Sequence, residues 1–185
     1  LWDFMQRFEI TSKAQTPVNA AQGLFGYTSY DAIEFFDTIK LKEYNESDKT
    51  VIQIPLMRYR LYQYVIAINH FKDELYLCEN KINGIERDPE LIERLIKSKD
   101  VPAFPFKATG AEYSNLTDEA YMEMVKKGIA ACYRGDVFQI VLSRRFEQKF
   151  TGDEFNVYRA LRSINPSPYL FYFDYGDYKL MGCSP

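Results

Sequence analysis

Few residues in this sequence have the types and spacing that chemistry requires. His70 is the single histidine, and it falls in the polar segment 69–73 between two β-favouring runs. A histidine-based catalytic triad needs partners that orient the ring, whereas a turn position favours an exposed or structural role. Neither GxxxxGK[ST] nor GxGxxG occurs, so the sequence carries no phosphate-loop motif. The carboxylates cluster in helix starts and loops and form no recognisable Mg²⁺ cage.

Gln139 is the polar residue that stands out. It lies within the apolar run 137–142, and the pattern predicts a strand from Asp136 to Ser143, buried deep in a sheet. A buried amide has two donors and an acceptor to satisfy. Two interpretations are open: the side chain bonds a backbone kink or a water, or it points into a ligand cavity. If the strand continues, Arg145 shares the face of Gln139 and suits a carboxylate ligand, while Arg144 points the opposite way.

A second candidate is the segment Asn165-Pro166-Ser167-Pro168-Tyr169. Its two prolines fix φ and remove backbone donors, so the segment is rigid. A rigid loop beside a sheet edge makes a good ligand wall, because little entropy is lost on binding. A plain turn is the simpler alternative, and the residues alone favour it.

Composition limits the classes of function. Apolar residues make up 46% and charged residues 26% of the 185 residues, which is typical of a globular protein. The net charge of −3 without a basic stripe gives no reason to expect nucleic acid as a partner. No apolar run approaches the roughly 20 residues of a membrane span. Cys78, Cys132 and Cys183 form no CxxC pair, which favours a reducing, cytoplasmic setting.

Helical and strand-like patterns interleave along the chain, so we expect an α+β fold with a mixed β-sheet. Asp88-Pro89 is a helix start, and a second helix is expected from Thr117 to a stop at Gly135. The other predicted elements are a strand at 24–30, a short helix at 31–37, a hairpin of 57–68 with 74–78, a helix at 153–163 and a hairpin of 170–175 with 178–182.

The predicted organisation has two parts. Residues 99–116 contain Pro102, Pro105 and Gly110, which favour a connecting segment. We therefore expect an N-terminal α+β region at 1–100, a connector at 101–116, and a second region at 117–185.

These segments resemble the chorismate-utilising enzyme family, and within it the anthranilate synthase component I group. Residues 135–146 look like the family's GDIFQVVLSQRF strand, 165–171 look like NPSPYMF, and 182–185 look like the start of GASPE. Upstream, Gly23 to Tyr27 with Tyr30-Asp31 resembles the weaker GxxGYxxYD signature. The resemblance spans nearly the whole chain.

The resemblance implies a chorismate-binding α+β fold and a lyase that feeds tryptophan biosynthesis. Such an enzyme makes anthranilate and pyruvate from chorismate and from ammonia supplied by a glutamine amidotransferase subunit, with Mg²⁺ as cofactor. The family's magnesium ligands, a histidine and a carboxylate-binding arginine lie beyond the GASPE block. We therefore expect the fold to be incomplete at the C-terminus, and the 185-residue chain to be an inactive fragment by itself.

The resemblance also gives Gln139 a role as an active-site lining residue. Relatives that add water to chorismate carry a Lys at the matching position, where it acts as a base. An amide cannot titrate, so Gln139 points to the branch that uses ammonia as the nucleophile.

The proline-rich segment matches an effector site in the same family. By resemblance, Pro168, Tyr169 and Leu170 line a pocket for the inhibitor tryptophan, and Asn165 and Pro166 shape it. Tyrosine and proline suit the face of an indole ring.

Two alternatives remain open. The first is aminodeoxychorismate synthase component I, although Asn-Pro-Ser-Pro-Tyr favours the anthranilate group because the sister enzyme more often has NPAPF. The second is a non-catalytic, amino-acid-binding regulatory domain that ends naturally near Pro185.

Overall fold

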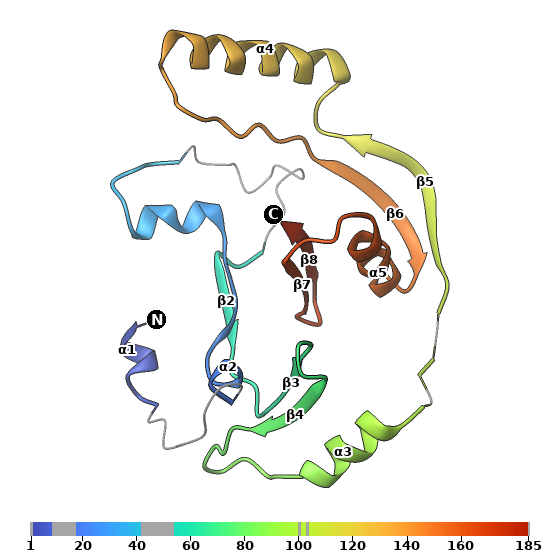
Figure 1. Ribbon diagram of the computed structural model, residues 1–185. Coiled ribbons are helices and arrows are strands. Elements are labelled where there is room, and N and C mark those ends of the chain that lie inside the picture. The colour runs from blue at the N-terminus through green and yellow to red at the C-terminus, as the bar shows by residue number, and fades with distance from the viewer. Residues whose placement is uncertain (1, 9–17, 42–53, 100, 103, 185) are drawn as a thin grey trace. The chain divides into compact units, whose positions relative to one another are not determined.

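The computed structural model describes residues 2–8, 18–41, 54–99, 101–102 and 104–184. They fall into two compact units, one within residues 2–99 and one within residues 101–184. Each unit combines helices with two-stranded antiparallel sheets (Figure 1). The expected α+β class is confirmed, although in the described part of the chain the strands pair two by two and form no larger mixed sheet.

The described part of the first unit holds three α-helices, four strands and one 3₁₀ helix. In chain order they are α1 (Trp2–Met5), α2 (Val18–Ala21), β1 (Phe25–Thr28), the 3₁₀ helix η1 (Tyr30–Phe35), β2 (Met57–Arg60), β3 (Tyr64–Asn69), β4 (Glu74–Glu79) and α3 (Pro89–Lys97). The helix predicted at 31–37 is thus a 3₁₀ turn. The helix predicted at Asp88-Pro89 is confirmed, since the Asp88 carboxylate accepts a hydrogen bond from the Leu91 amide at 2.8 Å.

Strands β1 and β2 approach each other unusually closely at Gly26. This residue pairs with Tyr59, and a Cβ added to it would lie 2.0 Å from the carbonyl oxygen of Arg58. Beside it, the hydroxyls of Thr28 and Tyr59 are 2.6 Å apart and form a cross-strand hydrogen bond. Gly26, the second glycine of the GxxGYxxYD signature, is therefore required by the close approach of the two backbones, and no larger residue fits.

The predicted first hairpin is confirmed in β3 and β4, which pair from Tyr64 opposite Glu79 to Asn69 opposite Glu74. The Asn69 side chain closes the turn by accepting a hydrogen bond from the Phe71 amide at 3.1 Å. His70 lies in this turn and is exposed. The long β-favouring run at 57–68 splits in two, because β2 pairs with β1 while β3 pairs with β4.

The second unit holds the remaining elements. They are β5 (Phe106–Ser114), α4 (Asp118–Arg134), β6 (Phe146–Gly152), α5 (Phe155–Ile164), β7 (Tyr169–Asp174) and β8 (Lys179–Ser184). The helices expected at 117–135 and 153–163 and the closing hairpin are confirmed within one to two residues at each end.

Most of the predicted connector at 101–116 is in fact strand β5, which pairs with β6. The two prolines at 102 and 105 lie before the strand, where they do not interrupt its ladder. Gly110 has φ of 73° and falls at a register shift between Thr109 and Tyr113. The glycine therefore marks a bulge within strand β5, so residues 106–114 are strand, while the two compact units divide at residues 100 and 101, where the predicted connector begins.

An aromatic cluster packs α5 against the hairpin β7–β8. The ring of Tyr172 lies 5.0 Å from that of Phe155, edge to face, and 5.4 Å from that of Tyr158. The ammonium group of Lys179 pairs with the Glu154 carboxylate just before α5. Burial, followed by the nearby carboxylates of Asp174 and Asp153, raises the pKa of the Tyr172 phenol. The ring contacts place this tyrosine in the packing between α5 and the hairpin.

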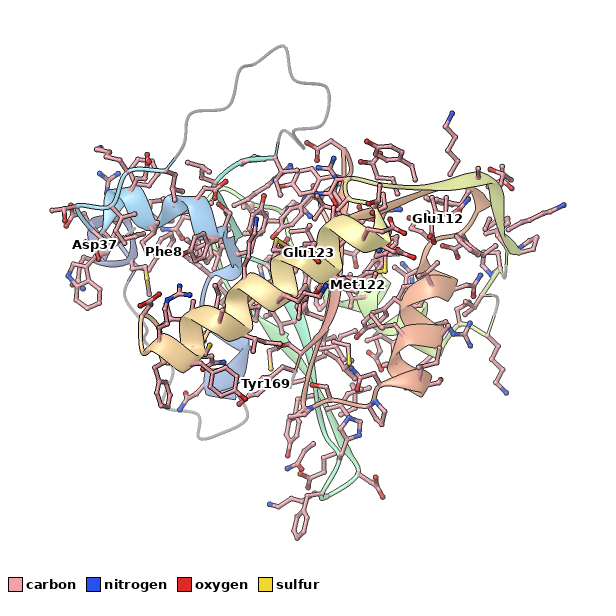
Figure 2. The ribbon with its side chains drawn as sticks, turned by 90° about the horizontal axis from the view of Figure 1, so that it is seen from above. Phe8, Asp37, Glu112, Met122, Glu123 and Tyr169 are labelled. Atoms are coloured by element: carbon pink, nitrogen blue, oxygen red, sulfur yellow. The ribbon has the colours of Figure 1, made fainter. Side chains whose placement is uncertain are left out.

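Little apolar surface is buried in the described part of the chain. The buried apolar residues there are Ala21, Ala32, Cys78 and Tyr175. Large apolar side chains stand out from the elements that carry them, as Met122 and Tyr169 do in Figure 2, with 53% and 68% of their surface exposed. Exposed apolar surface on this scale favours association.

We predict that the 185-residue chain self-associates when it is produced alone. The exposed apolar side chains and the open strand edges of four separate two-stranded sheets are the physical reason. Multi-angle light scattering after size exclusion measures the mass directly. A monodisperse monomer across a tenfold range of concentration would contradict the prediction.

We predict that Gly26→Ala destabilises the first unit by about 2–3 kcal/mol, because the new methyl group meets the backbone of Arg58. Gly84→Ala is the matched control. Its φ of +80° strains an alanine by about 1 kcal/mol, but nothing lies within 4 Å of the added carbon. Urea unfolding of both variants measures their stabilities, and Gly26→Ala should unfold at the lower urea concentration. Equal unfolding midpoints would contradict the prediction.

Candidate functional site

Helix α4 and the segment that follows it form the centre of the candidate site. The Thr117 hydroxyl caps the start of the helix by accepting a hydrogen bond from the Ala120 amide at 3.2 Å, and Gly135 ends it with a left-handed φ of 78°. The chain then runs back from α4 to β6 through residues 136–145, here named the return run (Figure 1).

The buried strand predicted at 136–143 is not formed. None of residues 136–145 is assigned to a strand, and Phe138 and Val141 are 102% and 83% exposed. A strand needs a neighbouring backbone to satisfy its amides and carbonyls, and the described cross-strand bonds of this region begin only where Asn115 bonds Arg145. Gln139 is accordingly exposed rather than buried.

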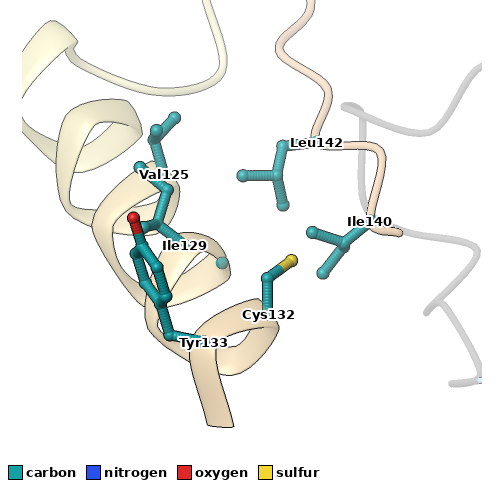
Figure 3. A pocket seen from close by; sticks show the side chains of 7 residues that line it. Val125, Ile129, Cys132, Tyr133, Ile140 and Leu142 are labelled. Carbon is teal, nitrogen blue, oxygen red and sulfur yellow. The ribbon is translucent and has the colours of Figure 1, made fainter. Parts of the chain in front are cut away.

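One side of the return run faces α4 across an apolar groove (Figure 3). Ile140 and Leu142 lie opposite helix residues spaced three and four apart, namely Val125, Gly128, Ile129, Cys132 and Tyr133. The groove has a volume of about 530 Å³ and is open to solvent. A Cβ on Gly128 would come within 3.2 Å of the Leu142 Cδ1 atom, so the glycine lets the run lie close to the helix.

The groove residues on α4 lie on one side of the helix, because they recur at three- and four-residue spacing. Their lining is almost wholly apolar, with the Cys132 thiol and the Tyr133 hydroxyl as its polar atoms. Such a surface suits the packing of apolar side chains better than the orientation of a charged substrate. Gln139 is not among the groove residues and is exposed, so its role as an active-site residue stays a prediction.

The two arginines at the end of the return run have protein partners. The Arg145 guanidinium pairs with the Glu147 carboxylate at 2.9 Å, so it is engaged within its own unit. Arg144 donates from Nε to the Ser114 hydroxyl at 2.7 Å and from Nη1 to the Asp118 carboxylate at 2.6 Å. The alternation of side chains along a strand did not predict the contacts of Arg144. The feature of the sequence that could have indicated them is the polar turn at residues 114–118.

The five predicted effector residues, Asn165, Pro166, Pro168, Tyr169 and Leu170, are contiguous between α5 and β7. The Asn165 amide caps α5 by donating to the Leu161 carbonyl at 2.9 Å. The Asn165 carbonyl accepts from the Cys183 thiol, and the Ser167 hydroxyl donates to the Ser184 carbonyl. These bonds attach the loop to the edge of β8, and Asn165, Pro166, Pro168 and Tyr169 are exposed. The loop is thus a fixed, open surface, while its effector role stays a prediction.

Within the described part of the chain, no three His, Cys, Asp or Glu side chains gather in a group that could hold an ion. The Mg²⁺ implied by the resemblance stays a prediction, since the resemblance assigns it no ligand among residues 1–185. None of the described helices is long and apolar enough to cross a membrane.

Known proteins resemble this chain over its whole length. A family model described as chorismate binding enzyme matches residues 1–185. Anthranilate synthase component 1 of Aquifex aeolicus is 31% identical over 88% of this chain and 35% of its own length. Anthranilate synthase alpha subunit 2, chloroplastic, of Arabidopsis thaliana is 34% identical over 88% of this chain and 29% of its own length. Component 1 of Methanothermobacter thermautotrophicus is 30% identical over 100% of this chain and 36% of its own length.

A solved structure agrees with the sequence relatives. The crystal structure of anthranilate synthase component I from Streptococcus pneumoniae matches with a TM-score of 0.68 and 27% identity, over 99% of this chain and 43% of that one. The chain spans about a third of the length of its curated relatives. Because the family model and the solved fold both extend over practically all of its residues, the chain belongs to the chorismate-binding enzyme family.

Proposed function

We propose that the intact protein is the chorismate-binding subunit of an anthranilate synthase. The reaction takes chorismate and ammonia to anthranilate, pyruvate and water. The observation that carries the proposal is the match of residues 1–185 to the chorismate-binding family, together with relatives that bear this enzyme's name.

Gln139 supports the choice of ammonia over water as the nucleophile. It lies on the exposed side of the return run, away from the Ile140 and Leu142 contacts to α4. Its amide cannot act as the general base that would activate a water molecule. It can donate and accept hydrogen bonds, which suits the orientation of a polar substrate or of ammonia.

A second subunit is part of the proposal. The relatives are named component 1 and alpha subunit, terms that belong to one part of a multi-part enzyme. We propose a glutamine amidotransferase as the other part, with glutamine as the source of ammonia. The three cysteines are free thiols, which fits the cytoplasmic setting expected for this chemistry.

Mg²⁺ enters the proposal as the group that would neutralise the substrate carboxylate. Since no set of three ligands gathers among the described residues, none of their roles is assigned through the metal. For the same reason, we propose that the 185-residue chain does not produce anthranilate by itself.

Tryptophan is the proposed feedback inhibitor, and the loop 165–168 with the start of β7 is the proposed contact. The bonds to Cys183 and Ser184 hold this loop on β8, so binding there costs little loop entropy. The Tyr169 ring is 68% exposed and offers a flat face to an indole.

We predict that the full reading frame produces anthranilate from chorismate, ammonium and Mg²⁺. Anthranilate fluorescence measures the product, and chromatography identifies it. The 185-residue chain under the same conditions is the comparison and should give no signal above the uncatalysed rate. Accumulation of aminodeoxychorismate would transfer the assignment to the sister enzyme.

We predict that Gln139→Leu in the full-length protein lowers the rate of anthranilate formation about ten-fold, because the hydrogen bonds of one amide are lost. Leucine keeps a similar volume without any donor or acceptor. Gln6→Leu is the matched control, since Gln6 is an exposed residue of the other unit. A Gln139→Leu protein with wild-type kinetics would remove Gln139 from the site.

A further inference from the structure

Arg144 makes two side-chain hydrogen bonds and one ring contact at the end of the return run. Its Nε donates to the Ser114 hydroxyl at 2.7 Å, and its Nη1 donates to the Asp118 carboxylate at 2.6 Å. The guanidinium carbon also lies 4.6 Å from the centre of the Phe146 ring. The Arg144 side chain is 17% exposed whereas that of Asp118 is 77% exposed. The bond to Ser114 and the ring contact therefore contribute more than the solvated ion pair.

The neighbouring residue fastens the backbone to the same turn. The Asn115 side-chain oxygen accepts a hydrogen bond from the Arg145 amide at 2.9 Å, and the Asn115 amide donates to the Arg145 carbonyl at 3.2 Å. Residues 144 and 145 are thus held to the turn 114–118 by both side chain and main chain. We name this set of contacts the turn clasp.

The opposite end of the return run is fixed by the end of α4. The Asp136 amide donates to the Ala131 carbonyl at 3.0 Å, and the Arg134 guanidinium pairs with the Asp136 carboxylate at 2.6 Å. Between these ends, Ile140 and Leu142 rest against Gly128 at 3.5 and 3.2 Å from a Cβ built there. Gln139 therefore lies on a run whose two ends and one face are held, and it is exposed among the described residues.

We propose that Arg144 is a positioning residue: through the turn clasp it sets the register of the return run and so the placement of the Gln139 amide toward the substrate. This inference rests on the proposed function. The family motif GDIFQVVLSQRF has Gln where this chain has Arg144. A glutamine side chain is shorter and uncharged. It lacks the forked guanidinium with which Arg144 donates to Ser114 and Asp118 at the same time. The Arg144 part of the turn clasp therefore depends on a residue at which this chain departs from that motif.

The charges around Arg144 are consistent with a fixed position. Arg144 lies beside the first turn of α4, where a positive group alone would oppose the helix dipole. Asp118 and Glu119 in that turn offset this effect, and Asp118 binds the guanidinium directly. An apolar residue at 144 would lose both donors, while the bonds between Asn115 and Arg145 would remain.

The test uses the full-length protein, four variants of Arg144 and Gln139, and one control variant. Arg144→Met keeps an apolar stem and removes the donors, and Arg144→Lys keeps the charge without the fork. Gln139→Leu, Arg144→Met and the variant that carries both substitutions form a double-mutant cycle with the wild type. Lys126→Met is the matched control, because it breaks the exposed Lys126–Glu123 ion pair on the same helix.

We expect Arg144→Met to lower kcat for chorismate consumption about ten-fold, since small displacements of a positioned group cost that much or more. KM for chorismate should stay within about two-fold if the amide acts mainly in the transition state. Arg144→Lys should recover part of the loss, and Lys126→Met should match the wild type. The double variant should be no slower than Gln139→Leu, because Arg144 acts through Gln139.

Additive losses in the double variant, or a lower Tm with unchanged kcat for Arg144→Met, would overturn the inference and leave a structural role. Product identity tests the proposed function separately. If chorismate is consumed to a different product with the same cycle, the proposed function falls and the positioning role stands. If anthranilate forms at the wild-type rate in Arg144→Met, the positioning role falls and the proposed function stands. A full-length protein that consumes no chorismate overturns both.

Discussion

Backbone hydrogen bonding at the two ends of the return run is the constraint on which the candidate site depends. Ten residues leave α4 in an extended conformation without a strand partner in the described part of the chain. An extended segment without cross-strand bonds keeps its place only through its ends and its packed side. The end of α4 supplies one attachment, and the bonds of Arg144 and Arg145 to the turn 114–118 supply the other.

The rest of the second unit serves this arrangement. Strands β5 and β6 form the antiparallel pair that ends next to the turn, with Ser114 opposite Phe146. Helix α4 spans the distance between the two attachments, and its Thr117 and Gly135 caps fix where the chain enters and leaves it. The apolar contact between Gly128 and Leu142 then sets which side of the run faces outward.

Local signals in the sequence predicted most of the elements, whereas pairing between distant residues could not be predicted. Asp88, Thr117 and Gly135 mark helix ends through capping chemistry that acts within four residues, and all three predictions hold. The apolar pattern at 136–143 has the composition of a buried strand, but burial requires a partner, and a pattern in one segment does not supply it. Residues 106–114 form strand β5 inside the predicted connector, because Gly110 permits a bulge as readily as a linker. Arg144 was assigned a direction by strand alternation, while its partners are about 30 residues away in the sequence.

The proposed role of Gln139 is to bind chorismate or the product formed from it, from its place on the return run. This role can be checked in a crystal structure of the full-length protein with chorismate or anthranilate bound. We expect the Gln139 amide within about 3.5 Å of a polar ligand atom, in hydrogen-bonding reach, with residues 136–145 still attached to the turn 114–118. A ligand bound elsewhere, with Gln139 facing solvent, would rule this role out.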